Sequence, residues 1–132
     1  MRLQNDDGGF RYTAAASGSA FPRSAAAAAA LSAAGSGRTP AAEKARKYLE
    51  QFVPSEKIPA NSFYLYGHYY SVQVMCGGAA PAEMSSKWQS AIVSELARGQ
   101  GKEGNWDDAM FGPEYATATA CVILQAQRRI EL

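Results

Sequence analysis

The sequence has little excess charge and no long apolar segment, and each shortage excludes a class of protein. Thirteen Lys and Arg residues stand against 12 Asp and Glu residues, which leaves a net charge of +1. Because binding to nucleic acid depends on clustered, unpaired cations, we expect no nucleic-acid partner. No stretch of about 18 apolar residues occurs, so we expect no membrane span.

Cysteine and histidine are also scarce. The two cysteines, Cys76 and Cys121, are too few for a disulfide scaffold and show no Cys-x-x-Cys or Cys/His ligand spacing. His68 is the single histidine. Since zinc needs three protein ligands, we expect no metal and no other cofactor. Residues 1–7 contain no apolar segment after Arg2, so we expect a soluble protein without a secretory signal in this chain, in an unassigned compartment.

Alanine, by contrast, is abundant. The chain holds 26 alanines against 16 Leu, Ile and Val residues together. A buried alanine contributes little hydrophobic free energy, so such an interior must bring backbones close together, which helices do best. The composition therefore favours an all-α protein, and its length is typical of one domain.

Two loops share a pattern that indicates internal repetition. Residues 4–10, the first Gln–Gly loop, and residues 100–106, the second, both read Gln-x-x-x-Gly-x-aromatic. The members are Gln4, Gly8 and Phe10 in the first loop and Gln100, Gly104 and Trp106 in the second. Their offset of 96 residues leaves room for two units of about 48 residues, as in helical repeats. The pattern predicts one domain with repeats at 1–52, 53–98 and 99–132.

Periodicity and chain-stopping residues predict five helices, at residues 24–34, 40–52, 62–76, 81–98 and 114–128. Gly35 suits a left-handed C-terminal cap, Thr39 an N-cap before Pro40, and Gly77-Gly78 a stop.

The first, third and fifth of these helices are apolar on most sides and should be the more buried ones. The second and fourth are amphipathic and should be more exposed. On the second helix the outer face is expected to carry Glu43, Lys44, Arg46, Lys47 and Glu50. Such alternation predicts inner and outer helices in two layers. Tyr70 and Tyr115 differ by 45 residues, as do Cys76 and Cys121, so both pairs are expected at equivalent places on neighbouring inner helices.

The second Gln–Gly loop, followed by Asp107-Asp108 and a helix with Tyr115, resembles the QW motif of the squalene cyclase and prenyltransferase repeat superfamily. The aromatic segment 63–75 resembles the inner helices of such proteins, and the resemblance covers nearly the whole chain. It implies a terpenoid cyclase-like α/α toroid, of which this chain would form about half a ring. It also implies self-association or a missing remainder of the toroid, and a structural role for the loop residues.

The catalytic signatures of these families are not found. Class II terpene cyclases use an Asp-x-Asp-Asp acid; residues 105–108 come nearest, with Asn105 first, but they belong to the loop region. Protein prenyltransferases hold zinc with an Asp-x-Cys pair and a distant His, and His68 has no such partner. We therefore expect no catalytic residue, no metal site and, for this chain alone, no enzyme.

The aromatic cluster remains as a candidate site, either as core packing or as the wall of a central cavity. The candidate ligand-binding residues are Tyr66, His68, Tyr69, Tyr70 and Tyr115. The leading hypothesis is a non-catalytic repeat module that binds an apolar or sugar-like small molecule, or a partner, on a concave aromatic face. The alternative is a fragment of a terpene cyclase or prenyltransferase whose catalytic residues lie outside this chain.

Overall fold

The all-α prediction is confirmed by a computed structural model, which describes residues 3–15, 18–55, 63–78 and 80–128. The helices are α1 (Phe21–Ala33), α2 (Pro40–Leu49), the short 3-10 helix η1 (Glu50–Phe52), α3 (Tyr64–Met75), α4 (Ala82–Gly99) and α5 (Gly112–Arg128). Their bounds lie close to the predicted ones, although residue 62 falls outside the described part. Within the described ranges the only β-structure is an isolated bridge between Gln4 and Phe10.

Local capping interactions explain where the helices begin and end. The Thr39 hydroxyl accepts a hydrogen bond from the Ala42 amide at 3.3 Å, so Thr39 is the N-cap of α2. After α1, Gly35 adopts a φ of +74°, and the Ser36 amide donates to the Leu31 carbonyl at 2.8 Å. This arrangement is a Schellman motif, which satisfies carbonyls at the end of a helix.

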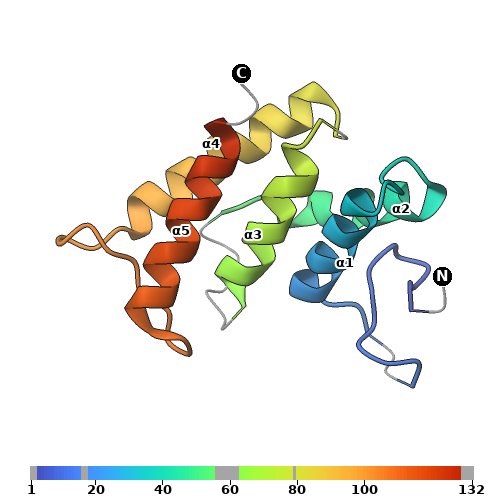
Figure 1. Cartoon of the computed structure of the whole chain (residues 1–132), viewed down its shortest axis with the longest axis horizontal. Helices are drawn as coiled ribbons and strands as arrows, with labels where there is room; N and C mark the ends of the chain where they lie inside the picture. The colour runs from blue at the N-terminus through green and yellow to red at the C-terminus, as the bar shows by residue number, and fades with distance from the viewer. Residues whose placement is uncertain (1–2, 16–17, 56–62, 79, 129–132) are drawn as a thin grey trace.

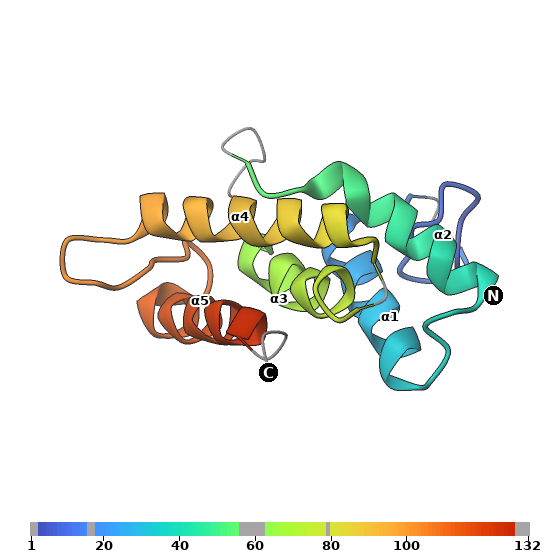
Figure 2. The ribbon, with the colours of Figure 1, turned by 90° about the horizontal axis from the view of Figure 1, so that it is seen from above.

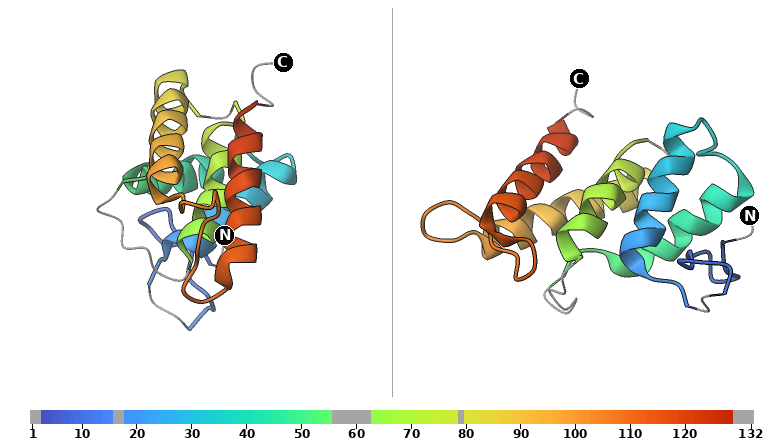
Figure 3. Two further views of the ribbon diagram at one scale, coloured as in Figure 1. Left: turned by 90° about the vertical axis from the view of Figure 1, so that its left-hand side faces the viewer. Right: turned by 60° about the horizontal axis from the view of Figure 1, so that its bottom comes forward.

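Within the described residues, the five α-helices form two layers. In the first layer α1, α3 and α5 lie side by side and run in the same direction, with α3 in the middle (Figures 1 and 3). In the second layer α2 packs against α1, and α4 packs against α3 and α5 (Figure 2). Helix α3 therefore has neighbours on three sides.

Helices α1 and α3 contact each other at a glycine. Ala25 and Ala28 of α1 are buried, and Gly67 stands at the contact on α3. A Cβ atom on Gly67 would lie 2.3 Å from Cε1 of Phe21. The Phe21 ring is itself stacked on Phe52, with ring centroids 4.7 Å apart. The lack of a side chain at Gly67 thus leaves room for the Phe21 ring between α1 and α3.

We expect Gly67→Ala to lower the free energy of unfolding by about 1 to 3 kcal/mol, because overpacking at this contact outweighs the gain in helix propensity. Urea denaturation measures the change. Gly99→Ala in α4 is the matched control: the nearest atom to its added Cβ would be Cδ1 of Trp106 at an ordinary 3.8 Å. If both variants were as stable as the parent, the close approach of α1 and α3 would be refuted.

The predicted difference in burial between the layers holds for α3 and α4 but is wrong for the other helices. Helix α4 buries only one stripe, formed by Trp88, Ile92 and Leu96, whereas α3 is buried on most sides. Helix α5, however, has exposed residues such as Val122 and Cys121, because it lies at one end of its layer. Conversely, α2 buries half of its residues, a larger share than α1.

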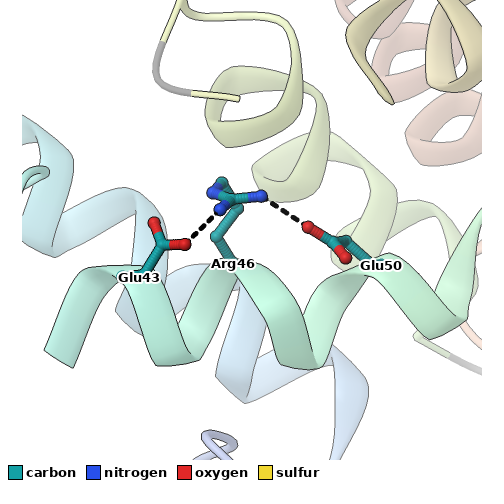
Figure 4. A network of polar contacts seen from close by, with 3 residues as sticks. All are labelled: Glu43, Arg46 and Glu50. Atoms are coloured by element: carbon teal, nitrogen blue, oxygen red, sulfur yellow. Dashed lines mark hydrogen bonds and ion pairs between the residues drawn. The ribbon is translucent and has the colours of Figure 1, made fainter. Parts of the chain in front are cut away.

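Arg46 was expected on the outer face of α2, and the structure corrects this. Its residue exposure is only 9%. Its guanidinium lies between the carboxylates of Glu43 and Glu50, and the nitrogen–oxygen distance to each is 2.5 Å (Figure 4). These partners, one helical turn away on either side, compensate the charge that burial removes from water.

The two Gln–Gly loops contain the same hydrogen bonds. The side-chain amide of Gln4 donates to the Gly8 carbonyl at 3.0 Å, and that of Gln100 donates to the Gly104 carbonyl at 2.8 Å. Both glycines have left-handed backbones, with φ of +88° and +85°, a region that favours glycine. The loops are therefore two copies of one local structure.

Backbone contacts repeat as well. The Asn5 amide donates to the Gly9 carbonyl at 2.8 Å, and the Gly101 amide donates to the Asn105 carbonyl at 2.7 Å. The next residue in each loop is a buried aromatic whose amide donates to a helix hydroxyl. These contacts join Phe10 to Ser24 Oγ at 2.8 Å and Trp106 to Thr117 Oγ1 at 3.1 Å. Each loop is thereby attached to the helix that follows it.

Candidate ligand-binding site

Four tyrosines meet between α3 and α5. They line a cavity of about 260 Å³, which we call the tyrosine pocket; its residues are Tyr66, Tyr69, Tyr70, Tyr115, Ala118, Thr119 and Val122. On each helix these residues follow the i, i+3, i+4 spacing, which places them on one face. The two faces oppose each other because α3 and α5 are neighbours in the same layer.

The tyrosine rings stand at steep angles to one another. Tyr66 and Tyr70 have centroids 5.0 Å apart and an interplanar angle of 64°, and Tyr69 and Tyr70 are 4.8 Å apart at 75°. Two phenylalanines extend this cluster: the ring centroids of Phe111 and Tyr115 are 4.9 Å apart, and those of Phe63 and Phe111 are 6.0 Å apart. Edge-to-face contacts of this kind hold the rings in place, so the pocket has preformed aromatic walls.

Within the described part of the chain, the lining of the tyrosine pocket carries no ionised side chain. Burial raises the pKa of the Tyr66 hydroxyl above its usual range, and the neighbouring Tyr70 and Tyr115 raise it further. Burial also raises the pKa of Tyr115; a hydrogen bond with Thr119 partly offsets this, and the nearby Asp108 carboxylate raises it again. Both hydroxyls are therefore neutral at neutral pH, and the pocket offers aromatic faces and a few hydroxyls.

A larger hollow of about 710 Å³ adjoins the pocket toward the C-terminal ends of α3 and α5. The two cavities share Tyr69 and Val122. The larger one adds the side-chain amides of Gln73 and Gln125 to its lining. The tyrosine pocket is thus the aromatic end of a longer groove whose other end offers hydrogen-bonding groups.

His68 does not join the tyrosines, although the sequence groups it with them. It is fully buried on the opposite face of α3, where its ring contacts Phe21 of α1, Tyr64 and Trp88 of α4. Neither ring nitrogen has a hydrogen-bond partner among the described residues. Burial lowers the pKa of His68 to about 3. It is a neutral core residue that no ligand in the tyrosine pocket would touch.

The three predicted tyrosines on α3 and Tyr115 on α5 are brought together, but three lining residues were missed. These are Ala118, Thr119 and Val122, which continue the helical stripe from Tyr115 at i+3, i+4 and i+7. That spacing was a usable signal, but small and β-branched residues do not stand out as aromatic residues do.

The two residue pairs with the 45-residue offset lie in different settings. Tyr70 and Tyr115 face the same pocket from neighbouring helices. Cys76 is buried whereas Cys121 is exposed, and both are free thiols, so the cysteines do not occupy equivalent environments. The exposed position of Cys121 follows from the end position of α5.

The carboxylates near the second loop act in local turns. Asp108 Oδ1 accepts hydrogen bonds from the amides of Met110 at 2.9 Å and Phe111 at 3.0 Å. No cluster of three or more His, Cys, Asp or Glu residues with metal-binding geometry occurs in residues 3–15, 18–55, 63–78 and 80–128. In the same ranges, no helix is both long and apolar enough to cross a membrane.

Comparison with known proteins gives no relative: no family model, curated protein or solved structure matches the chain.

Proposed function

We propose that the chain is a non-catalytic helical-repeat module that binds a small, largely apolar molecule in the tyrosine pocket. The observation that carries the proposal is the pocket itself, which is lined from two helices by four tyrosines and no ionised side chain. Ligand sites are typically concave and mostly apolar, with a few polar groups that orient the ligand. This pocket and the adjoining amides fit that description.

An apolar ligand fits better than a sugar-like one. Sugars present many hydroxyls, which require hydrogen-bond partners when they leave water. The lining of the tyrosine pocket supplies only the tyrosine and Thr119 hydroxyls, without amide or carboxylate side chains. An apolar cavity of roughly 150 Å³ is large enough for benzene, so a cavity of about 260 Å³ has room for a bicyclic molecule.

The repeat part of the proposal is supported by the two Gln–Gly loops. Matching hydrogen bonds and matching left-handed glycines at an offset of 96 residues are typical of repeated structural units. We propose that the two layers of helices belong to an α/α toroid that resembles the squalene cyclase and prenyltransferase repeats. In that arrangement the tyrosine pocket faces the inside of the ring, because Tyr66 and Tyr70 lie opposite the face of α3 that contacts α4.

The same resemblance supports an alternative, in which the chain is part of a terpene cyclase or prenyltransferase and the pocket is one wall of its active site. The loop geometry favours this family architecture equally for an enzyme and for a binding module. The two functions differ in whether ligand is converted. Incubation with isoprenoid diphosphates and analysis of the products separates them.

We expect indole, a neutral bicyclic probe, to shift the NMR signals of the Ala118 and Val122 methyl groups. Tyr66→Ala and Tyr70→Ala should each weaken this binding about tenfold, which corresponds to roughly 1.4 kcal/mol of lost contact. Methyl-detected titration measures both the site and the affinity.

Tyr12→Ala is the matched control, because Tyr12 is 78% exposed and does not line the pocket. Its affinity for indole should equal that of the parent protein. Shifts confined to residues outside the tyrosine pocket, or unchanged affinity in both pocket variants, would contradict the proposed site.

A further inference from the structure

The aromatic walls of the tyrosine pocket stand at steep angles to one another. The ring pairs Tyr66–Tyr70 and Tyr69–Tyr70 meet at 64° and 75° and are not parallel. Tyr115 adds a wall from the opposite helix. Rings at such angles contact a rounded group from several sides, and it is their faces that are electron-rich.

The surroundings of the tyrosine pocket favour a positively charged ligand. Among the residues that the structure describes, no Lys or Arg lines the pocket. The Asp108 carboxylate lies close enough to Tyr115 to raise the pKa of its hydroxyl. Because a cation over an aromatic face is attracted by the ring quadrupole, both the aromatic walls and this carboxylate stabilise a cation and disfavour an anion.

The lining lacks strong hydrogen-bond acceptors, and this indicates which class of cation fits the pocket. A primary ammonium has three N–H donors that must be satisfied when it leaves water. The lining residues carry no carboxylate and no side-chain amide. A trimethylammonium group has no N–H donor and needs none of these partners, whereas a polar tail attached to it could reach the Gln73 and Gln125 amides in the adjoining hollow.

We propose that the ligand of the tyrosine pocket is a small organic cation with a trimethylammonium group, held among the rings of Tyr66, Tyr69, Tyr70 and Tyr115. The inference rests on the proposed function, since it assigns a ligand class to the same pocket. It adds a requirement for charge that an apolar ligand does not have.

The test is a titration of the full chain with choline and, separately, with 3,3-dimethylbutan-1-ol, in which carbon replaces the charged nitrogen. Signals of the Ala118 and Val122 methyl groups report binding. We expect choline to bind at least about fivefold more tightly than the alcohol. Equal affinities would overturn this inference and leave the proposed apolar site intact, whereas the absence of binding by choline, the alcohol and indole would overturn both.

Two variants separate charge recognition from shape. Tyr70→Leu keeps apolar volume but removes an aromatic face, so it should weaken choline binding about fivefold or more and change alcohol binding little. Asp108→Asn keeps the acceptor oxygen for the Met110 and Phe111 amides but removes the charge. It should weaken choline binding about twofold or more, without effect on the alcohol. Equal losses for both ligands in both variants would contradict the inference.

The same group also occurs on lipid headgroups, so vesicles of phosphatidylcholine form a separate arm. Binding of free choline, with or without a response to the vesicles, supports the proposal. A response to the vesicles without any response to free choline would contradict it, because the pocket would then not recognise the cation itself.

Discussion

Trp106→Ala is expected to lower the free energy of unfolding by about 3 to 5 kcal/mol. The side chain is 8% exposed, and its Nε1 donates to the Leu96 carbonyl at 2.8 Å near the end of α4. Its backbone amide donates to Thr117 Oγ1 in α5. Truncation therefore removes buried ring surface and the side-chain link between α4 and the loop that leads to α5. Urea denaturation followed by circular dichroism measures the loss.

Trp106→Phe is the matched control, because Phe10 occupies the corresponding place in the first Gln–Gly loop. This variant keeps an aromatic ring and loses the hydrogen bond to Leu96, so it should cost only about 1 to 2 kcal/mol. Indole binding should survive in both variants, since Trp106 does not line the tyrosine pocket. If Trp106→Ala kept full stability but lost indole binding, the loop would belong to the binding site instead.

The helix ends could be predicted from the sequence because they depend on neighbours in the chain. Thr39 before Pro40 and Gly35 after an apolar run determine backbone geometry within a few residues. The Gln-x-x-x-Gly pattern is local in the same sense, since Gln100 and Gly104 form their hydrogen bond across one turn.

Burial was harder to predict because it depends on which elements become neighbours. Helix α5 has apolar residues on several sides, but it lies at the end of its layer and exposes Val122 and Cys121. Arg46 is charged, and charged residues usually lie at the surface, but its two carboxylate partners allow it to be buried on α2. Neither outcome follows from helical periodicity alone.

The candidate site was predicted only in part, because its lining also depends on which elements become neighbours. Aromatic residues on α3 indicated a wall, and the 45-residue offset indicated Tyr115 as its partner. Excluding His68 from that wall would have required knowing which side of α3 faces α4. The contact with Trp88, 20 residues further along the chain, decides this.

We expect the stability of the protein to fall by about 3 kcal/mol between pH 7 and pH 4 through His68 alone. Burial among Phe21, Tyr64 and Trp88 holds the pKa of His68 at about 3, below the value of about 6.5 in an unfolded chain. Below pH 6.5 the unfolded chain takes up a proton that the folded protein does not. The stabilisation is therefore complete above this pH and is lost as the pH falls toward 3.

The measurement compares urea denaturation at several pH values for the parent protein and for His68→Phe and His68→Leu, two neutral replacements of different size. Since His68 is the single histidine, the difference in unfolding free energy between parent and variant isolates its titration, while the carboxylates contribute to both proteins alike. The difference should change by about 1.4 kcal/mol per pH unit below pH 6. Two results would show that the histidine is not enclosed between α1, α3 and α4. One is that the free energy of unfolding depends on pH in the same way in the parent and the variants. The other is that the ring protons of His68 titrate near pH 6.5 by NMR.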